Sequence, residues 1–293
     1  MKIDKNTRFL IVGLGLLGGS YAMALKKQGF RVEAVTRSRD SIDYALEQGI
    51  IDAGAASPDP ELIGRADVVV LALYPHVLLD WVRENQRYFR PGALITDVTG
   101  VKTAVVGPVQ AMLRQDVEFV AAHPMAGRET LGVRSADDRI FRGANYIVTP
   151  TDKNTPAAIA ACEELGRLLG FSSISCLTPE QHDEMIGFVS QLTHCIAVAL
   201  MTCNDIQHLE RYTGDSFRDL TRIAKINDEM WSELFLDNRQ ALLAQMDQFS
   251  AQLHRLRDLL EQQDREGMRD MMRASTARRK ALEAKNQKGS DCL

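Results

Sequence analysis

Residues 9–18 read FLIVGLGLLG, and this stretch decides the fold of the first half of the chain. Residues 9–12 form a short apolar run rich in strand formers, 20–28 read as a helix, and a second strand is expected at 31–36. Glycines in the pattern GxGxxG between a strand and a helix let the backbone turn sharply and approach a pyrophosphate. The residues expected to line this dinucleotide site are Gly13, Gly15, Leu16, Leu17 and Gly18.

A second interpretation exists for the uncharged stretch 9–25, because it follows a basic start and ends near Ala22 and Ala24, as a secretory signal peptide does. Its four glycines favour a tight turn over a continuous membrane-inserting helix, and its length is short of a comfortable membrane span. Cleavage after Ala24 would also remove the glycines of the dinucleotide site. We therefore expect the stretch to belong to the folded protein.

The composition is that of a folded soluble chain. The 293 residues predict two domains, and 45 % are hydrophobic and 25 % charged. A net charge of −4 gives no basic surface for nucleic acid, so we expect neither a nucleic-acid nor a membrane partner. The five cysteines form no CxxC pair, which argues against a disulfide framework and a zinc site and favours a cytoplasmic protein with no metal.

Strand and helix signals alternate through the first part of the chain and then stop. Further strands are expected at 67–73, 93–98, 118–122, 146–149 and 173–177, with a helix at 156–169. From Pro179 onward the pattern is helical. We therefore predict an α/β Rossmann-type doubly wound sheet over 1–178 and an all-α helical domain over 179–293.

The end of the second strand carries information on the cofactor. NAD enzymes usually place an acidic residue there for the ribose 2′-hydroxyl, whereas this chain has Thr36, Arg37, Ser38 and Arg39. Two guanidinium groups suit a 2′-phosphate, so NADP is predicted over NAD, which stays possible. The alternative is that both arginines are solvated loop charges.

Two apolar stripes mark the helical half. Apolar residues recur at helical spacing from Met185 to Cys203 and again from Leu242 to Leu260. A Rossmann-type domain is too small to cover both, so we expect two subunits to pack their helical domains together as a homodimer.

Four side chains are candidates for chemistry. His123 follows a predicted strand, where it would face the cofactor crevice and could take a proton from an alcohol; a structural loop histidine is an equal alternative. His194 is expected opposite the apolar stripe, on a face shared with Ser190. Ser216 is expected to start a helix that carries Asp219 and Arg222. These two residues form either a surface ion pair or a carboxylate clamp in which Asp219 orients Arg222.

Together these segments resemble the prephenate and arogenate dehydrogenases. The matching pieces are the glycine loop, 96–98 with 101–102, 123–127 with Glu129, 190–194, and 217–224. The resemblance implies a Rossmann domain with a helical dimerisation domain, a small-molecule substrate, and NAD(P)-dependent oxidative decarboxylation of prephenate on the route to tyrosine. It assigns His123 as the catalytic base, Asp97 to the cofactor side, and the substrate pocket to His194, Arg222, Ser190, Trp231 and Glu129, of which Glu129 would gate entry.

The chain departs from the family pattern at several positions. Many members have Ser where this chain has Gly100, so His123 must find another partner, and Gln191 and Thr193 replace the His and Pro of a common SHLPH segment. The chain is also expected to lack a chorismate mutase or ACT domain. Arogenate is the alternative substrate. A β-hydroxyacid dehydrogenase, an imine reductase and a non-catalytic nucleotide-sensing module are the alternative functions.

Overall fold

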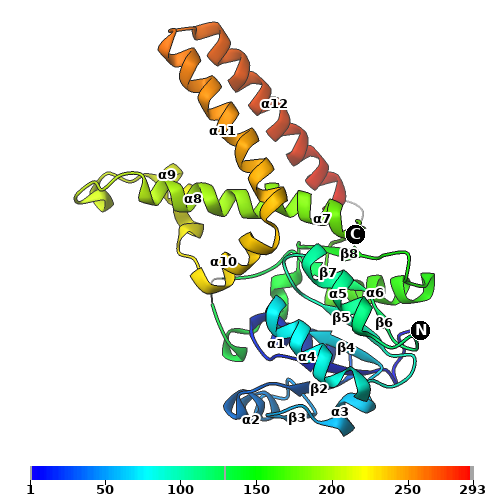
Figure 1. The fold of residues 1–293 in the computed structure, drawn as a ribbon. Coiled ribbons are helices and arrows are strands. Elements are labelled where there is room, and N and C mark those ends of the chain that lie inside the picture. Colours follow the sequence, from blue (N-terminus) through cyan, green and yellow to red (C-terminus); the bar gives the residue numbers. More distant parts are fainter. Residues whose placement is uncertain (1, 129, 291–293) are drawn as a thin grey trace.

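The computed structural model describes residues 2–128 and 130–290, with side chains up to residue 283. Within these residues, the first half of the chain forms a six-stranded parallel sheet in the order β3-β2-β1-β4-β5-β6 (Figure 1). The strands are β1 (Arg8–Val12), β2 (Arg31–Val35), β3 (Ala53–Ala55), β4 (Val68–Leu71), β5 (Leu94–Asp97) and β6 (Glu118–Phe119). The order reverses direction beside β1, which is where such sheets bind their ligands.

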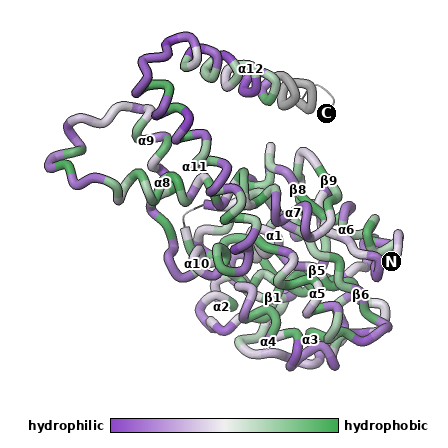
Figure 2. The backbone as a smooth tube through the Cα atoms, turned by 45° about the horizontal axis from the view of Figure 1, so that its top comes forward, coloured by the Kyte–Doolittle hydropathy of each residue, from purple (hydrophilic) through white to green (hydrophobic). Residues whose placement is uncertain are grey.

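Helices cover both faces of this sheet, because its strands are apolar on both sides. Phe9 and Ile11 of β1 face one core and Leu10 and Val12 face the other, and Figure 2 shows hydrophobic residues along β1 and β5. The first core takes residues from α1 (Leu16–Lys27), α2 (Arg39–Glu47) and α6 (Pro156–Leu169). The second takes residues from α3 (Pro60–Gly64), α4 (Pro75–Asn85) and α5 (Thr103–Met112). The predicted α/β Rossmann-type fold is confirmed.

The single strand expected at 118–122 is divided into two strands, because the chain changes sheets at Val120. The Val120 N–H still donates to the carbonyl of Ile95, but the next donor, the Ala122 N–H, is taken by the carboxylate of Asp97 at 3.1 Å. A second, three-stranded sheet then forms from β7 (Ala121–Pro124), β8 (Asn145–Thr149) and β9 (Ser173–Cys176). His123 therefore lies within β7, antiparallel to β8, and not in a loop after a parallel strand.

The first helix also begins earlier than expected, at Leu16 and not at residue 20. Gly18 and Gly19 look like turn residues in the sequence, but both are buried in the first turns of α1. A Cβ at Gly19 would lie 2.7 Å from the Cβ of Ala136, so close packing against the segment after β7 requires glycine there.

The second half of the described chain is helical. Its elements are α7 (Pro179–Ile186), a π-helical turn (Gly187–Gln191), α8 (Leu192–Thr202), α9 (Asp215–Thr221), α10 (Asp228–Asp237), α11 (Arg239–Glu261) and α12 (Arg265–Ser290). Short 3₁₀ turns lie at Gln86–Tyr88, Val133–Ser135, Asp138–Phe141, Leu209–Arg211 and Arg222–Ala224. Figure 1 shows α11 and α12 packed against each other and projecting away from the sheet.

The π-helical turn changes which faces of the α7–α8 run are buried. An extra residue per turn breaks the uniform spacing of about 100° per residue that an α-helix has, so the expected single stripe from Met185 to Cys203 is interrupted. The polar face, with His182, Asp183 and Gln191, is buried against the rest of the chain. The apolar face is instead partly exposed, with Val189 45 % exposed.

Candidate active site

In the glycine turn at the end of β1, the space beside Gly15 is open, whereas Gly13 and Gly18 are closely packed. Gly13 has φ +96°, and a Cβ there would lie 2.3 Å from the carbonyl oxygen of Ala72; a Cβ at Gly18 would lie 1.9 Å from the carbonyl oxygen of Gly13. At Gly15, which precedes α1, nothing lies within 4 Å of a Cβ, and no side chain caps the helix. The first N–H groups of α1 are thus free to meet a phosphate, and the turn fits a dinucleotide.

The residues after β2 have distinct surroundings. The Thr36 N–H donates to the carbonyl of Ala55. Ser38 caps α2 by accepting from the Ser41 N–H at 3.1 Å, and Arg39 pairs with Asp43 at 3.0 Å. Arg37 is exposed, and within the described part of the chain it forms no ion pair.

Asp97, expected on the cofactor side, is fully buried, and its contacts are with the protein. Its carboxylate accepts from Lys102 Nζ at 2.6 Å, from the N–H and hydroxyl of Thr99, and from the Ala122 N–H. Lys102 is equally buried and also donates to the Ala122 carbonyl at 2.7 Å. Burial lowers the pKa of Lys102, although Asp97 opposes the shift. The pair therefore fixes the strand that carries His123.

His123 has the partner that Gly100 does not supply. Its Nδ1 lies 2.9 Å from Nε2 of His182, whose Nδ1 lies 2.7 Å from Oδ1 of Asp183. Burial, then His182 and Lys102, hold the pKa of His123 well below its ordinary value. The arrangement leaves Nε2 as the nitrogen of His123 available to a substrate.

The sequence reasoning did not identify His182 and Asp183. Both lie on α7, which Thr178 and Gln181 start with a reciprocal capping box. The capping-box pattern can be recognised in the sequence, and it would have placed His182 and Asp183 in the first turns of a helix. That this helix packs on β7 was not readable, because it depends on the contact between the two halves of the chain.

Around Gly100 there is space for a small side chain. A Cβ there would lie 3.5 Å from Cδ2 of Leu234 in α10 and 4.0 Å from Cε1 of His123, both ordinary contacts. With glycine there, this position offers His123 no hydroxyl.

His194 and Trp231 come together from α8 and α10. Their ring centroids are 3.7 Å apart at 30°, and Nδ1 of His194 donates to the carbonyl of Ser190 at 2.9 Å. The stacking brings together two of the residues expected in the substrate pocket. Ser190 contributes its carbonyl oxygen to His194.

Arg222 begins the 3₁₀ turn that follows α9 and packs against α8, the helix of His194. The expected helix start at Ser216 is wrong: α9 begins at Asp215 after Gly214, and Asp215 pairs with Arg218 at 2.5 Å. A carboxylate in the first turn suits the positive end of the helix, which explains the earlier start. Glu129, the expected gate, lies outside the described residues.

Polar contacts hold α7, α10 and the start of α11 together, and one residue of α10 also contacts the first half of the chain. Gln191, one of the departures from the family pattern, donates to the carbonyl of Leu234 at 2.9 Å and accepts from Asn238 at 2.7 Å. Asn238 also donates to the carbonyl of Asp183. On the other side of α10, Glu233 accepts from the N–H of His76 at 2.8 Å and contacts its ring nitrogen Nδ1 at the same distance.

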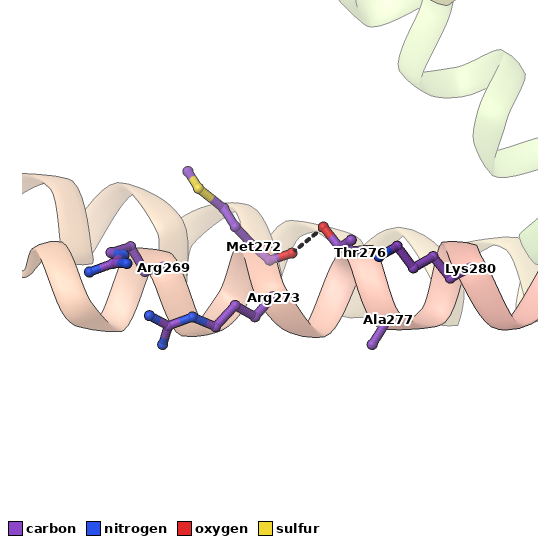
Figure 3. Close-up of a pocket in the computed structure, with 6 residues that line it drawn as sticks. All are labelled: Arg269, Met272, Arg273, Thr276, Ala277 and Lys280. Carbon is purple, nitrogen blue, oxygen red and sulfur yellow. Dashed lines mark hydrogen bonds between the residues drawn. The ribbon is translucent and has the colours of Figure 1, made fainter.

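A hollow on α12 lies apart from these residues. Figure 3 shows that its lining comes from one exposed helix: Arg269, Met272, Arg273, Thr276, Ala277 and Lys280. Arg269 and Arg273 are paired with acidic residues of the same helix. In the described residues no group of His, Cys, Asp and Glu could hold a metal ion. The candidate chemistry centres on His123 and its partner His182.

Known proteins share both halves of this arrangement. Residues 21–174 match the family described as prephenate dehydrogenase, nucleotide-binding domain, and residues 178–274 match prephenate dehydrogenase, dimerization domain. The chain belongs to the prephenate dehydrogenase family. It is accordingly a nicotinamide-dependent dehydrogenase that acts on a small molecule.

Individual members of the family are similar over most of the chain. A prephenate dehydrogenase of Bacillus subtilis (strain 168) is 32 % identical over 270 residues, which cover 88 % of this chain and 71 % of that protein. The structure of prephenate dehydrogenase from A. aeolicus in complex with hydroxyphenyl propionate and NAD+ is 28 % identical, with a TM-score of 0.87, over 96 % of this chain and 100 % of that one. Synechocystis arogenate dehydrogenase is 25 % identical, with a TM-score of 0.83, over 94 % and 100 %.

Proposed function

We propose that this chain is a prephenate dehydrogenase that uses NADP in preference to NAD, with His123 as its base. The observation that carries the proposal is the hydrogen-bonded row His123, His182 and Asp183, which leaves Nε2 of His123 available, in a chain whose glycine turn fits a dinucleotide. The related proteins named for prephenate or arogenate support this substrate class.

In this reaction the chain's own residues handle one proton. Nε2 of His123 accepts the proton of the ring hydroxyl as hydride leaves the same ring carbon. The ring carboxylate departs as carbon dioxide, and the electrons of the broken carbon–carbon bond make the ring aromatic. The phenolate oxygen then takes the proton back from His123, so no net proton is consumed. A nicotinamide supplies the acceptor for the hydride.

The substrate's charges suit residues of the helical half. Arg222 would bind a substrate carboxylate through a charge-assisted hydrogen bond. His194, held by Ser190 and stacked on Trp231, would position the substrate. Asp97 would act through Lys102 and the Ala122 N–H, and not by touching the cofactor. Glu129, which the family resemblance assigns to gating, would act at the entrance.

NADP is proposed because residues 36–39, directly after β2, include no acidic residue and because Arg37 is exposed without an ion-pair partner among the described residues. Arg37→Ala should raise the KM for NADP at least tenfold and leave the KM for NAD within about twofold, since a charge-assisted bond to phosphate is lost. Arg39→Ala, whose side chain already pairs with Asp43, is the matched control. An equal rise for both cofactors would contradict the proposal.

The direct test of the function is an absorbance assay of NAD(P)H formation with prephenate and arogenate, each with NAD and with NADP. Fastest turnover with prephenate and NADP supports the proposal. Faster turnover with arogenate would make arogenate the substrate, in line with the similarity to Synechocystis arogenate dehydrogenase. No turnover in any combination would refute both.

We further propose a homodimer in the cytoplasm, with the cofactor domain at 1–178 and the helical domain at 179–293. By length and composition, the run Pro179–Thr202 is apolar enough to cross a membrane, and 28 % of its most apolar window is buried. We assign it to the folded helical half because its polar face carries His182 and Asp183, which are buried against the rest of the chain. Its exposed face and that of α11, where Leu253 is 56 % exposed, suit a second subunit. Light scattering should show a dimer, and Leu253→Glu should weaken it; a wild-type monomer at micromolar concentration would overturn the proposal.

A further inference from the structure

We infer that His182 and Asp183 form a positioning pair that sets the tautomer of His123, so that the imidazole presents an unprotonated Nε2 to the substrate. The inference rests on the proposed role of His123 as the base. It assigns a function to two buried residues that carry no other chemistry in the site.

Asp183 is held as a carboxylate at one end of the row. Its Oδ1 accepts from the Lys102 N–H and its Oδ2 from the N–H of Thr103, both at 2.8 Å, and the Thr103 hydroxyl also donates to Oδ2. These are the first N–H groups of α5, so Asp183 caps that helix from the other half of the chain. Burial opposes ionisation, but the hydrogen bonds from His182 and Thr103 prevail and lower the pKa of Asp183.

The positions of the protons follow from the acceptors. Because the carboxylate of Asp183 only accepts, Nδ1 of His182 carries a proton, and a neutral His182 then has a lone pair on Nε2. That lone pair accepts from Nδ1–H of His123 at 2.9 Å, which leaves Nε2 of His123 unprotonated. Burial lowers the pKa of His182, which favours the neutral form that the row requires.

The absence of a side chain at Gly100 gives this row its importance. No hydroxyl reaches the imidazole from that position, and the nearest group there is the apolar side chain of Leu234. Among the described residues, the hydrogen-bond partner of the His123 ring is His182. Orientation of the base therefore depends on α7.

Other charged groups face the two rings from the packed elements. Lys102, before α5, and Asp97, on β5, form a buried pair beside them. Asp237 of α10 is electrostatically coupled to Asp183. These charges are unchanged in the variants below, so a change in kcat or in the tautomer of His123 reports on His182.

The test compares His182→Leu, which has no acceptor, with His182→Gln, whose amide oxygen can accept from Nδ1–H. His182→Leu should lower kcat at least tenfold, and by no more than the factor of about 10²–10⁴ that loss of a general base causes. His182→Gln should retain most of the activity. The matched control is His208→Asn at an exposed histidine, which should leave kcat unchanged.

A double-variant comparison separates positioning from a structural role. In a His123→Asn background, His182→Leu should cause no further loss of kcat, because there is no base left to orient. Gly100→Ser should recover part of kcat in His182→Leu, since the serine Cβ fits and its hydroxyl can reach the imidazole. An equal loss of kcat in both backgrounds would overturn the inference.

A readout without turnover keeps this inference apart from the proposed function. Nitrogen chemical shifts of the imidazoles in ¹⁵N-labelled wild-type protein should show His123 protonated at Nδ1 and His182 neutral near pH 7. His182→Leu should shift His123 toward the Nε2–H tautomer. Wild-type protein with His123 protonated at Nε2 would refute the positioning pair, whatever substrate the enzyme uses.

Discussion

Replacing Lys102 with Met should lower the free energy of unfolding more than almost any other substitution of a charged residue in the chain. The ammonium group is 0 % exposed and donates to Asp97 at 2.6 Å, to Thr99 at 3.2 Å and to the Ala122 carbonyl at 2.7 Å. Methionine fills a similar volume but leaves the carboxylate of Asp97 buried without its counter-charge. Breaking such a pair from one side costs about 3–5 kcal/mol.

Thermal unfolding followed by circular dichroism measures this loss. A domain of 150–250 residues loses about 2–4 °C of Tm per kcal/mol, so Lys102→Met should lower the transition by about 6–20 °C. The control is Lys26→Met: Lys26 pairs with Asp52 at the surface, with side chains 27 % and 33 % exposed, and such a pair contributes at most about 1 kcal/mol. If Lys102→Met lowers Tm no more than Lys26→Met does, the buried pair does not hold β7 in place.

Three further predictions concern the site. Because a base must be unprotonated to act and the pKa of His123 lies well below its ordinary value, kcat/KM should rise with pH to a plateau reached below pH 6.5, where 6.5 is the ordinary value; an acidic limb above pH 7 in the pH–rate profile would contradict this. Gly18→Ala should abolish cofactor binding in a fluorescence titration, since its Cβ would lie 1.9 Å from a carbonyl oxygen of the turn. Gly107→Ala is the control: nothing lies within 4 Å of a Cβ there, in an exposed stretch of α5, so the change should stabilise the protein by about 0.5–1 kcal/mol. Arg222→Ala should raise the KM for prephenate at least tenfold. Arg218→Ala, which loses an exposed pair with Asp215 and a hydrogen bond to the Thr213 carbonyl, should not; equal effects would place the carboxylate clamp elsewhere.

Much of the cofactor half could be predicted from the sequence, because local pattern and fold agree there. The apolar run before Gly13 and the alternating strand and helix signals place β1, β2, β4 and β5 within a few residues. Parallel strands that are covered on both faces are apolar throughout, so they are easy to recognise. The glycine turn could also be predicted from its GxGxxG pattern. The structure gives the reason for glycine at residue 13: its φ is +96°, and a Cβ there would collide with the carbonyl oxygen of Ala72.

The parts that were not predicted depend on single side chains from distant segments. The run 118–122 is continuously strand-like, and the carboxylate of Asp97 breaks it by binding the Ala122 N–H. The π-helical turn at Gly187–Gln191 leaves no mark on the apolar spacing, yet it alters which residues face the sheet. His182 and Asp183 look like ordinary polar residues of a helix until α7 packs on β7.

Because Asp183 caps α5 from the other half of the chain, the row of His123, His182 and Asp183 forms only when the two halves pack together. A nucleotide can be bound by the glycine turn alone, since that turn is built entirely from the first half of the chain. Proton transfer, in contrast, requires α7 to be seated, because only then do α5 gain its cap and the base gain its neighbour. Asn238 contacts both Asp183 of α7 and Gln191, so mutations that remove these contacts should loosen α7. Such proteins should bind cofactor normally but turn over slowly, with no change at any residue that touches either ligand.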